Sequence, residues 1–327
     1  MSVDIEALAR GVCAADKTQV ARALNLIENK RPEVGREVAA LLAALGRERV
    51  PLGQRVGLTG PPGVGKSSLV AVLARALRQR GRTVGVVAVD PSSMRSGGAL
   101  LGDRARMAFD PGDPGLFVRS LATQGALGGL AHATHAAVEV LAAAYETVLI
   151  ETVGVGQTEI AVTQLADTVV LVVQPGSGDV LQFLKAGVME IPDLLVVNKA
   201  DHGATATRAA SDLKAALGTL RQVGAGESDQ PVLLTSARDQ QGIEPLADAI
   251  DRHAEALGPQ GVLDRRRAGH AAWARDWLTH RVGTLGIDAL GGDDAVATRL
   301  DAALARGEPA LSAAHALVDT LTVRRRA

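Results

Sequence analysis

One short segment constrains the fold of this chain more than any other feature. The run GPPGVGKSS, residues 60–68, follows the apolar stretch RVGLT and precedes a stretch with helical spacing up to Arg80. It fits the Walker A pattern G-x-x-x-x-G-K-[ST], in which backbone N–H groups surround phosphate oxygens at the N-terminus of a helix. A chance glycine turn would not require this strand-loop-helix context. The segment therefore predicts a phosphate-binding loop (P-loop) in an α/β fold.

Each position of this loop has an expected task. Lys66 is expected to reach the β- and γ-phosphates of a nucleotide and to act in catalysis, and the Ser67 hydroxyl is expected to bind Mg²⁺. The remaining loop residues expected to contact the nucleotide are Gly60, Gly63, Val64, Gly65 and Ser68. The loop predicts a nucleoside triphosphate with Mg²⁺ but does not separate ATP from GTP.

A second motif indicates which base is bound. Asn198-Lys199-x-Asp201 follows an apolar stretch in LLVVNKAD. A carboxylate at Asp201 can accept hydrogen bonds from both guanine N1–H and the exocyclic amine, a donor pair that adenine lacks. The run TSA resembles the GTPase loop that contacts the guanine oxygen, so Ser236 and Ala237 join the expected site. An isolated N-K-x-D could be a surface turn, but its order and spacing after the P-loop favour guanine recognition.

Acidic residues at strand ends supply candidate metal ligands and catalytic groups. Glu151 ends an apolar run in VLIETVGVGQTE, and its length suggests a water-mediated contact to Mg²⁺. In the same segment Gly154 is expected to donate to the γ-phosphate and Gln157 to orient water, although a capping role for Gln157 stays open. Asp90 in VAVDPSS is a candidate base or metal ligand, with a turn before proline as the alternative. Asp103 in SGGALLGDRARM is a candidate switch carboxylate near Mg²⁺.

The chain alternates between strand and helix patterns over most of its length. Between Arg55 and about Gly258, short β-rich runs alternate with helical stretches, as a mostly parallel sheet with crossover helices requires. The expected strands are Arg55–Thr59, Val84–Val89, Val148–Ile150, Thr168–Val173, Leu194–Val197 and Val232–Thr235. We expect a helical N-terminal extension (1–50), a P-loop domain (51–258) and a helical C-terminal arm (259–327) that begins after a break at Gly258-Pro259. From the residues alone, the apolar stripe of the arm could pack either on the main domain or against a second copy of the chain.

Composition narrows the cellular setting and the partners. The chain has 327 residues, a net charge of −1 and one cysteine. Near-neutral charge gives no reason to expect nucleic acid or membrane binding, and a single cysteine excludes a disulfide or a cysteine cluster within the chain. The N-terminus shows no signal-peptide pattern and no run of 18 apolar residues occurs. A cytoplasmic protein is expected.

Taken together, these segments resemble one family. The runs LATQGALGGLA, ETVGVGQTE and PGSGDVLQFLKAGVMEIPDLLVVNKAD are similar to the MeaB/ArgK group of methylmalonyl-CoA mutase-associated GTPases. The resemblance implies a SIMIBI-class P-loop fold with helices flanking the sheet and a homodimer formed by the C-terminal arm. It also implies GTP hydrolysis that gates adenosylcobalamin loading, protection or repair of an acyl-CoA mutase, which alone would hold the cobalamin.

The resemblance further implies a partner-coupling switch at Lys185. The family usually shows Gly-Ile-Lys where this chain has Phe183-Leu184-Lys185. This difference leaves open which mutase is the partner: methylmalonyl-CoA mutase or an isobutyryl- or 2-hydroxyisobutyryl-CoA relative. By itself, Lys185 could equally be a solvated helix lysine.

Other classes of function stay open at this point. A GTPase for nickel-enzyme maturation would need histidine or cysteine ligands, and His132 and His135 have a suitable i, i+3 spacing. No cysteine lies near them in sequence, however, and the pattern favours a surface or core role for both histidines. A kinase-like ATPase linked to amino-acid transport conflicts with Asn198 and Asp201. A third possibility is a module that binds the nucleotide without hydrolysing it, and a hydrolysis assay would separate this class from an enzyme. For the GTPase, we expect in-line attack of water on the γ-phosphate, slow unless a partner orders the switches.

Overall fold

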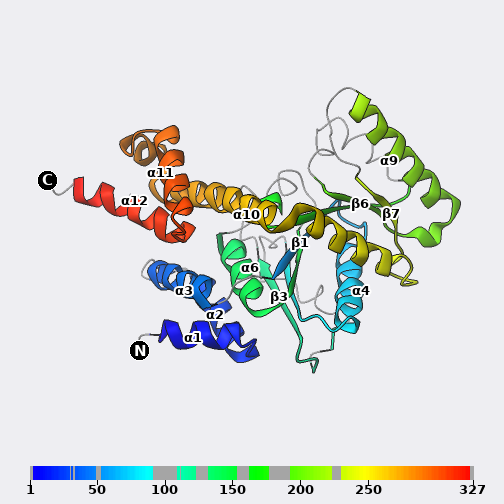
Figure 1. The fold of residues 1–327 in the computed structure, drawn as a ribbon, viewed down its shortest axis with the longest axis horizontal. Helices are drawn as coiled ribbons and strands as arrows, with labels where there is room; N and C mark the ends of the chain where they lie inside the picture. The colour runs from blue at the N-terminus through cyan, green and yellow to red at the C-terminus, as the bar shows by residue number, and fades with distance from the viewer. Residues whose placement is uncertain are drawn as a thin grey trace, which may run out of the picture. The chain divides into compact units, whose positions relative to one another are not determined.

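The computed structural model of this chain divides into two compact units (Figure 1). It describes all residues except 1–2, 30, 32–33, 49–52, 91–108, 111, 123–131, 153–161, 177–191, 223–229 and 325–327. The helical unit comprises Met1–Gly53, His132–Ala144 and Leu263–Ala327, and the sheet unit comprises Gln54–Ala131 and Tyr145–Val262. The helical unit thus joins both ends of the chain with one internal helix.

The sheet unit is built on a parallel sheet, as the alternating pattern predicts. In the described residues it has seven strands in the order β3-β2-β4-β1-β5-β6-β7, and each pairing is parallel. The strands are β1 Gln54–Thr59, β2 Val84–Asp90, β3 Leu116–Ala122, β4 Thr147–Glu151, β5 Thr168–Val173, β6 Leu194–Val197 and β7 Val232–Leu234. Because the strands are parallel, their carboxyl ends meet at one edge, where α/β sheets bind ligands.

The centre of the sheet places β1 between two partners. Its Leu58 lies opposite Glu151 of β4 on one side and Val170 of β5 on the other. From β1 the chain crosses beyond β4 to form β2, whereas the later strands β5 to β7 extend the other half. The loop after β1 therefore starts at the point where the strand order changes direction, which is the usual position of a ligand crevice.

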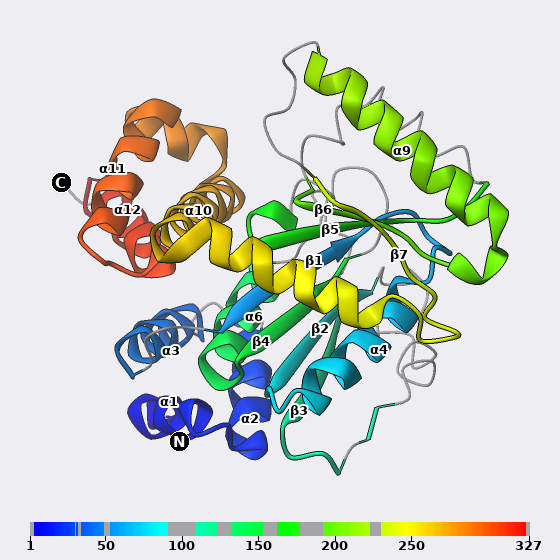
Figure 2. The same cartoon turned by 45° about the vertical axis from the view of Figure 1, so that its right-hand side comes forward.

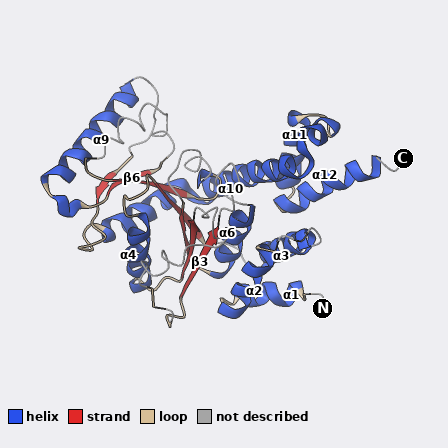
Figure 3. Ribbon diagram, turned by 180° about the vertical axis from the view of Figure 1, so that it is seen from behind, coloured by secondary structure: helices blue, strands red, loops and turns tan. Residues whose placement is uncertain are grey.

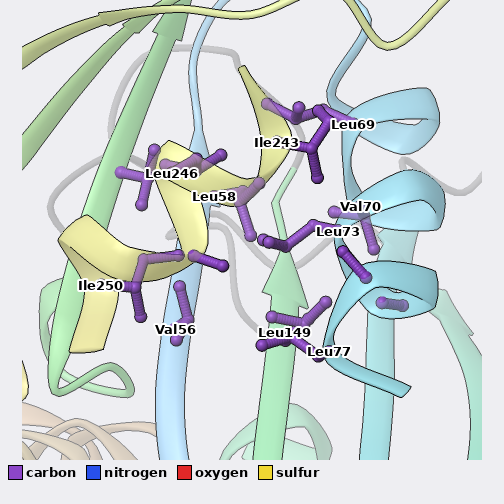
Figure 4. Packing of buried hydrophobic residues seen from close by; sticks show 14 of the residues in the cluster. Val56, Leu58, Leu69, Val70, Leu73, Leu77, Leu149, Ile243, Leu246 and Ile250 are labelled. Atoms are coloured by element: carbon purple, nitrogen blue, oxygen red, sulfur yellow. The ribbon is translucent and has the colours of Figure 1, made fainter. Parts of the chain in front are cut away.

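Helices cover the sheet on both faces because side chains alternate along each strand. On one face, α4 (Lys66–Gln79) and the beginning of α10 (Ile243–Ala289) pack on Val56, Leu58 and Leu149 (Figures 2 and 4). On the other face, α9 (Ala204–Gln222) packs on Leu171 and Val173. The intervening Val170 and Val172 belong to the first core. This burial on both faces explains the nearly continuous apolar runs in the sequence.

One strand is missing from the sequence prediction. The edge strand β3 (Leu116–Ala122) pairs with β2 along its full length, from Val84 to Asp90. Its sequence LFVRSLA contains Arg119 and Ser120. An edge strand pairs with one neighbouring strand and is less enclosed than a central strand, so it does not require a continuous apolar run. The six expected strands are present, with ends that differ by one residue at most.

The helical unit confirms helices on both sides of the sheet sequence. It contains α1 (Ile5–Cys13), α2 (Lys17–Ile27), α3 (Val34–Glu48), α6 (His132–Ala144), the α10 residues from Leu263 onward, α11 (Asp293–Ala305) and α12 (Ala310–Arg324). Asp4 and Asp16 cap α1 and α2 by accepting backbone N–H groups. Arg36 of α3 pairs with Asp319 of α12 at 3.1 Å, so helices from the two ends of the chain touch. No strand occurs in the described part of this unit (Figure 3).

The expected helix break at Gly258-Pro259 is wrong. Helix α10 runs from Ile243 to Ala289 with Pro259 inside it. A residue before proline is disfavoured in the α region, but Gly258 adopts φ +65°, which glycine tolerates. The backbone thus leaves the right-handed α conformation at Gly258, although α10 is one helix across the pair. The expected three-domain division itself stays a prediction. Among the described residues, no helix is long and apolar enough to cross a membrane.

Candidate nucleotide site

The loop between β1 and α4 depends on glycines with positive φ, two of which have no room for a side chain. Gly60, Gly63 and Gly65 all have positive φ, at 139°, 80° and 90°. A Cβ at Gly60 would lie 2.0 Å from the Val172 carbonyl oxygen, and one at Gly65 would lie 2.7 Å from Asn198 Nδ2. The loop therefore lies directly against β5 and the segment after β6, at the N-terminus of α4.

Lys66 lies across this loop. Its Nζ donates to the Gly60 carbonyl at 2.7 Å and to the Pro61 carbonyl at 2.9 Å. The residue is only 7% exposed, so its ammonium group is held at the loop rather than in solvent. A cation in this position, next to the positive end of the α4 dipole, favours an anionic ligand. Val64 is buried in the loop, and Ser68 lies in the first turn of α4.

Two candidate metal ligands meet at the same strand edge. Ser67 Oγ, in the first turn of α4, donates to Glu151 Oε1 at 2.5 Å, and Glu151 is the last residue of β4. Glu151 is 8% exposed. A hydroxyl and a carboxylate are the oxygen donors that Mg²⁺ prefers, so the residues present fit this ion. Whether Glu151 acts directly or through water stays a prediction.

Asn198 joins the segments that the sequence places in one site. Its Nδ2 donates to the Val64 carbonyl at 2.8 Å. Its Oδ1 accepts from Thr235 Oγ1 at 3.2 Å and from the Ala237 backbone N–H at 3.3 Å. The side chain is 2% exposed. One amide thereby ties the P-loop to both predicted base-binding segments.

Lys199 makes a second connection. The residue adopts φ +61°, and its Nζ donates to the Gly63 carbonyl at 2.9 Å and to Gln174 Oε1. These contacts confirm that the P-loop and the turn after β6 converge. Gln174 is a residue that the sequence interpretation missed. Its signal was its place directly after β5, at the strand edge where ligands bind.

Asp201 is oriented by the TSA segment. Ser236 Oγ donates to Asp201 Oδ1 at 2.8 Å and accepts from the Asp239 N–H at 3.1 Å. The hydrogen bond from Ser236 is the main reason that the pKa of the Asp201 carboxyl lies below its ordinary value, with a smaller contribution from Arg238, 3.9 Å away. The acid therefore stays ionised at neutral pH, as acceptance of two guanine donors requires.

Several predicted residues lie outside this description. Asp90 is the last residue of β2, but the structure does not describe its side chain. Asp103, Gly154, Gln157 and Lys185 fall in residues that are not described. Their roles stay predictions. The residues that are described and meet at the carboxyl edge come from the P-loop, β4, the turn after β6 and the TSA segment.

The comparison with known families identifies the group to which this site belongs. The family model described as methylmalonyl-CoA mutase-associated GTPase MeaB matches residues 20–287. The chain belongs to the MeaB family. A probable GTPase of Mycobacterium tuberculosis is 41% identical over 288 residues, with 85% of this chain and 84% of that protein covered. The mouse mitochondrial methylmalonic aciduria type A homolog is 35% identical over 292 residues, with 85% and 70% covered.

A solved structure shows the same fold. The crystal structure of a LAO/AO transport system kinase matches with a TM-score of 0.66 and 24% identity, over 98% of this chain and 99% of that one. At this identity the match shows the fold alone, and it confirms the predicted P-loop α/β fold with helical parts at both ends. Membership of the MeaB family makes this chain a guanine-nucleotide-binding GTPase, which favours GTP over the ATPase alternative.

Proposed function

We propose that GTP hydrolysis by this MeaB-family GTPase gates the adenosylcobalamin loading, protection or repair of an acyl-CoA mutase. The family match over residues 20–287 carries the proposal, because its description names methylmalonyl-CoA mutase. The name of the mouse relative refers to methylmalonic aciduria, which supports the same link. The partner is methylmalonyl-CoA mutase or a relative, and adenosylcobalamin stays with that partner.

The contacts at the strand edge support a division of tasks among the site residues. Lys66 reaches the β- and γ-phosphates from its place across the loop, where backbone N–H groups of Gly63, Gly65 and Ser68 contact the phosphates. Asp201 reads guanine, helped by the backbone of Ala237. Asn198 acts mainly as a positioning residue, since both of its amide atoms are engaged by protein groups.

Mg²⁺ would be held by Ser67 and Glu151, with Asp90 and Asp103 as further ligands. When bound, the ion offsets negative charge on the β- and γ-phosphates. Within the chain, Lys66 stabilises charge on the transferred phosphoryl group, and the Gly154 N–H donates to the γ-phosphate. Asp90 or Gln157 orients the attacking water. These groups position water only when the switch segments are ordered, and binding of the mutase orders them. Hydrolysis is therefore slow until the mutase binds.

Partner coupling and dimerisation complete the proposal. Lys185 relays the nucleotide state to the mutase. The C-terminal arm forms a homodimer, which is supported by two large apolar side chains that are exposed there, Leu263 at 56% and Leu285 at 83%. Contact with a second copy of the chain would bury these two side chains.

The test combines binding and turnover. Purified methylmalonyl-, isobutyryl- and 2-hydroxyisobutyryl-CoA mutases are each mixed with the chain loaded with GDP or a non-hydrolysable GTP analogue. We expect one mutase to bind in a nucleotide-dependent manner and to raise the GTPase rate. Lys66→Ala is the control, since it should abolish hydrolysis while the protein stays folded. If none of the mutases binds or stimulates hydrolysis, the chaperone role is wrong although the GTPase assignment stands.

A further inference from the structure

The helical unit contains a second group of potential ligands, apart from the residues of the nucleotide site. His135, Glu139 and His270 each offer one ligand atom, and these atoms all lie within 4.8 Å of one another. His135 and Glu139 are four residues apart on α6, so they share a helix face. His270 comes from the part of α10 that belongs to the same unit. The sequence suggested His132 as a companion of His135; the side chain of His132 is not described, and the fold places His135 with Glu139 and His270.

The three side chains already lie in contact distance. His270 Nε2 lies 2.7 Å from Glu139 Oε1, and the ring centroids of His135 and His270 are 5.3 Å apart with an interplanar angle of 52°. His135 is 4% exposed, whereas the Glu139 and His270 side chains are 14% and 26% exposed. The group is thus buried on the His135 side and reachable by solvent on the His270 side.

An aromatic contact holds one of the imidazoles in place. The Trp273 ring stacks on the His135 ring, with centroids 4.2 Å apart and an interplanar angle of 4°. Trp273 follows His270 by three residues, so both lie on one face of α10. Stacking fixes the plane of the His135 ring. Such support by neighbouring side chains is what a binding site requires.

From these observations we propose that His135, Glu139 and His270 form a Zn²⁺-class divalent metal site. Two imidazole nitrogens and one carboxylate oxygen are a donor set that Zn²⁺ takes with a fourth, open position. Tetrahedral Zn²⁺ ligands at about 2.0–2.1 Å from the ion lie about 3.4 Å apart, so shifts of about 1 Å bring these atoms into place. A plain His270–Glu139 ion pair would need neither the buried His135 nor its stacking partner.

The experiment uses the full chain saturated with Mg²⁺ and GDP, so that added metal does not report the nucleotide site. The Trp277→Phe variant leaves Trp273 as the sole tryptophan, because the chain has two. Titration with Co²⁺ should quench Trp273 fluorescence to saturation at one ion per chain. It should also give the visible absorption of four- or five-coordinate Co²⁺. Zn²⁺ should displace the Co²⁺ and abolish both signals.

Variants locate the site. His135→Gln, Glu139→Gln and His270→Gln should each weaken Zn²⁺ binding by at least about tenfold. His280→Gln is the matched control, since it removes an exposed histidine from the same helix and should leave binding unchanged. Circular dichroism and GDP affinity check that each variant is folded.

The proposal is overturned if Co²⁺ produces neither quenching nor visible bands in the Trp277→Phe protein, a result that depends on none of the ligand variants. Equal weakening by His280→Gln and His270→Gln would also overturn it, because binding would then be non-specific. Neither outcome bears on GTP hydrolysis or on the mutase, which are tested separately.

Discussion

At the scale of single residues, the nucleotide site divides its tasks between neighbours in sequence. Asn198 is buried and engages the P-loop and the TSA segment, whereas Asp201, three residues later, accepts from the Ser236 hydroxyl and lies 3.9 Å from Arg238. Asn198 thus holds the segments of the site together, and Asp201 is placed to bind the guanine base. This difference gives separate expectations for the two positions.

Replacing Asp201 should change which base is bound. In Asp201→Asn, the amide oxygen can still accept from N1–H, but the amide nitrogen faces the exocyclic amine of guanine, donor against donor. We expect GDP affinity to fall by roughly 10- to 160-fold, since a lost charged hydrogen bond costs roughly 1.5–3 kcal/mol. Xanthine carries an oxygen at that position, so XDP affinity should rise. Competition between GDP and XDP measures this, and unchanged GDP preference would contradict the base-reading role.

Gly65 should tolerate no side chain. A methyl group there would lie 2.7 Å from Asn198 Nδ2 and would force alanine into φ +90°. We expect Gly65→Ala to lower the free energy of unfolding by about 1–3 kcal/mol and to weaken GDP binding, because the P-loop must move away from Asn198. Urea unfolding and GDP titration measure these effects. Gly46→Ala in α3 is the control, as a Cβ there meets nothing within 4 Å.

At the scale of elements, the packing near the start of β4 involves a buried tyrosine. Tyr145, two residues before the start of β4, is fully buried and lies near Phe117 of β3, with ring centroids 6.2 Å apart. Among the described residues its hydroxyl has no hydrogen-bond partner. Burial disfavours the phenolate and raises the pKa of Tyr145 to about 12 from 10.0. The packing of β4 and β3 is therefore sensitive to alkaline pH.

This raised pKa fixes the direction of a pH effect. The unfolded chain ionises Tyr145 near pH 10 and the folded chain does so only near pH 12. The stability that this group contributes is therefore complete below pH 10 and is lost as the pH rises towards 12. Urea unfolding at pH 8, 10 and 11 should show this loss. In Tyr145→Phe the loss should be smaller, while stability at pH 8 should be equal or higher by about 1 kcal/mol.

The chain offers a direct control for this titration. Tyr145 is the single tyrosine of the sequence, so the phenolate absorbance of the protein reports it alone. The folded protein should show no phenolate band near pH 10, and the denatured protein should show it. Ionisation of the folded protein at its ordinary pKa would contradict the burial argument.

At the scale of the whole molecule, the exposed apolar side chains of α10 predict an assembly. Leu285 is 83% exposed in the C-terminal arm. If the arm dimerises there, Leu285→Glu should shift the protein from dimer to monomer, since it places charge in an apolar contact. GDP binding should persist. Sedimentation velocity measures the state, with Thr298→Glu on α11 as the control that adds the same charge at an exposed position. A wild-type monomer would exclude the proposed dimer.

Local sequence patterns were enough for much of this fold. The P-loop and N-K-x-D motifs are short, and each has its strand and adjoining loop within a few residues, so residue order alone indicates them. Strands β5 and β6 are runs of Val and Leu because both faces are covered, and their bounds matched the prediction. Strand β3 was missed because an edge strand accepts Arg119 and Ser120 without a local penalty.

What the sequence by itself determined is the class of site and the alternation of strands and helices that makes a parallel sheet, because both follow from residues close together in the chain. Only the tertiary structure decided that Asn198 holds Val64, that Gln174 meets Lys199, and that Glu139 meets His270 across 131 residues of sequence. Such contacts arise from the packing of distant elements. The periodicity of apolar residues, two in a strand or 3.6 in a helix, indicates which face of an element is buried. It does not indicate which other element packs on that face.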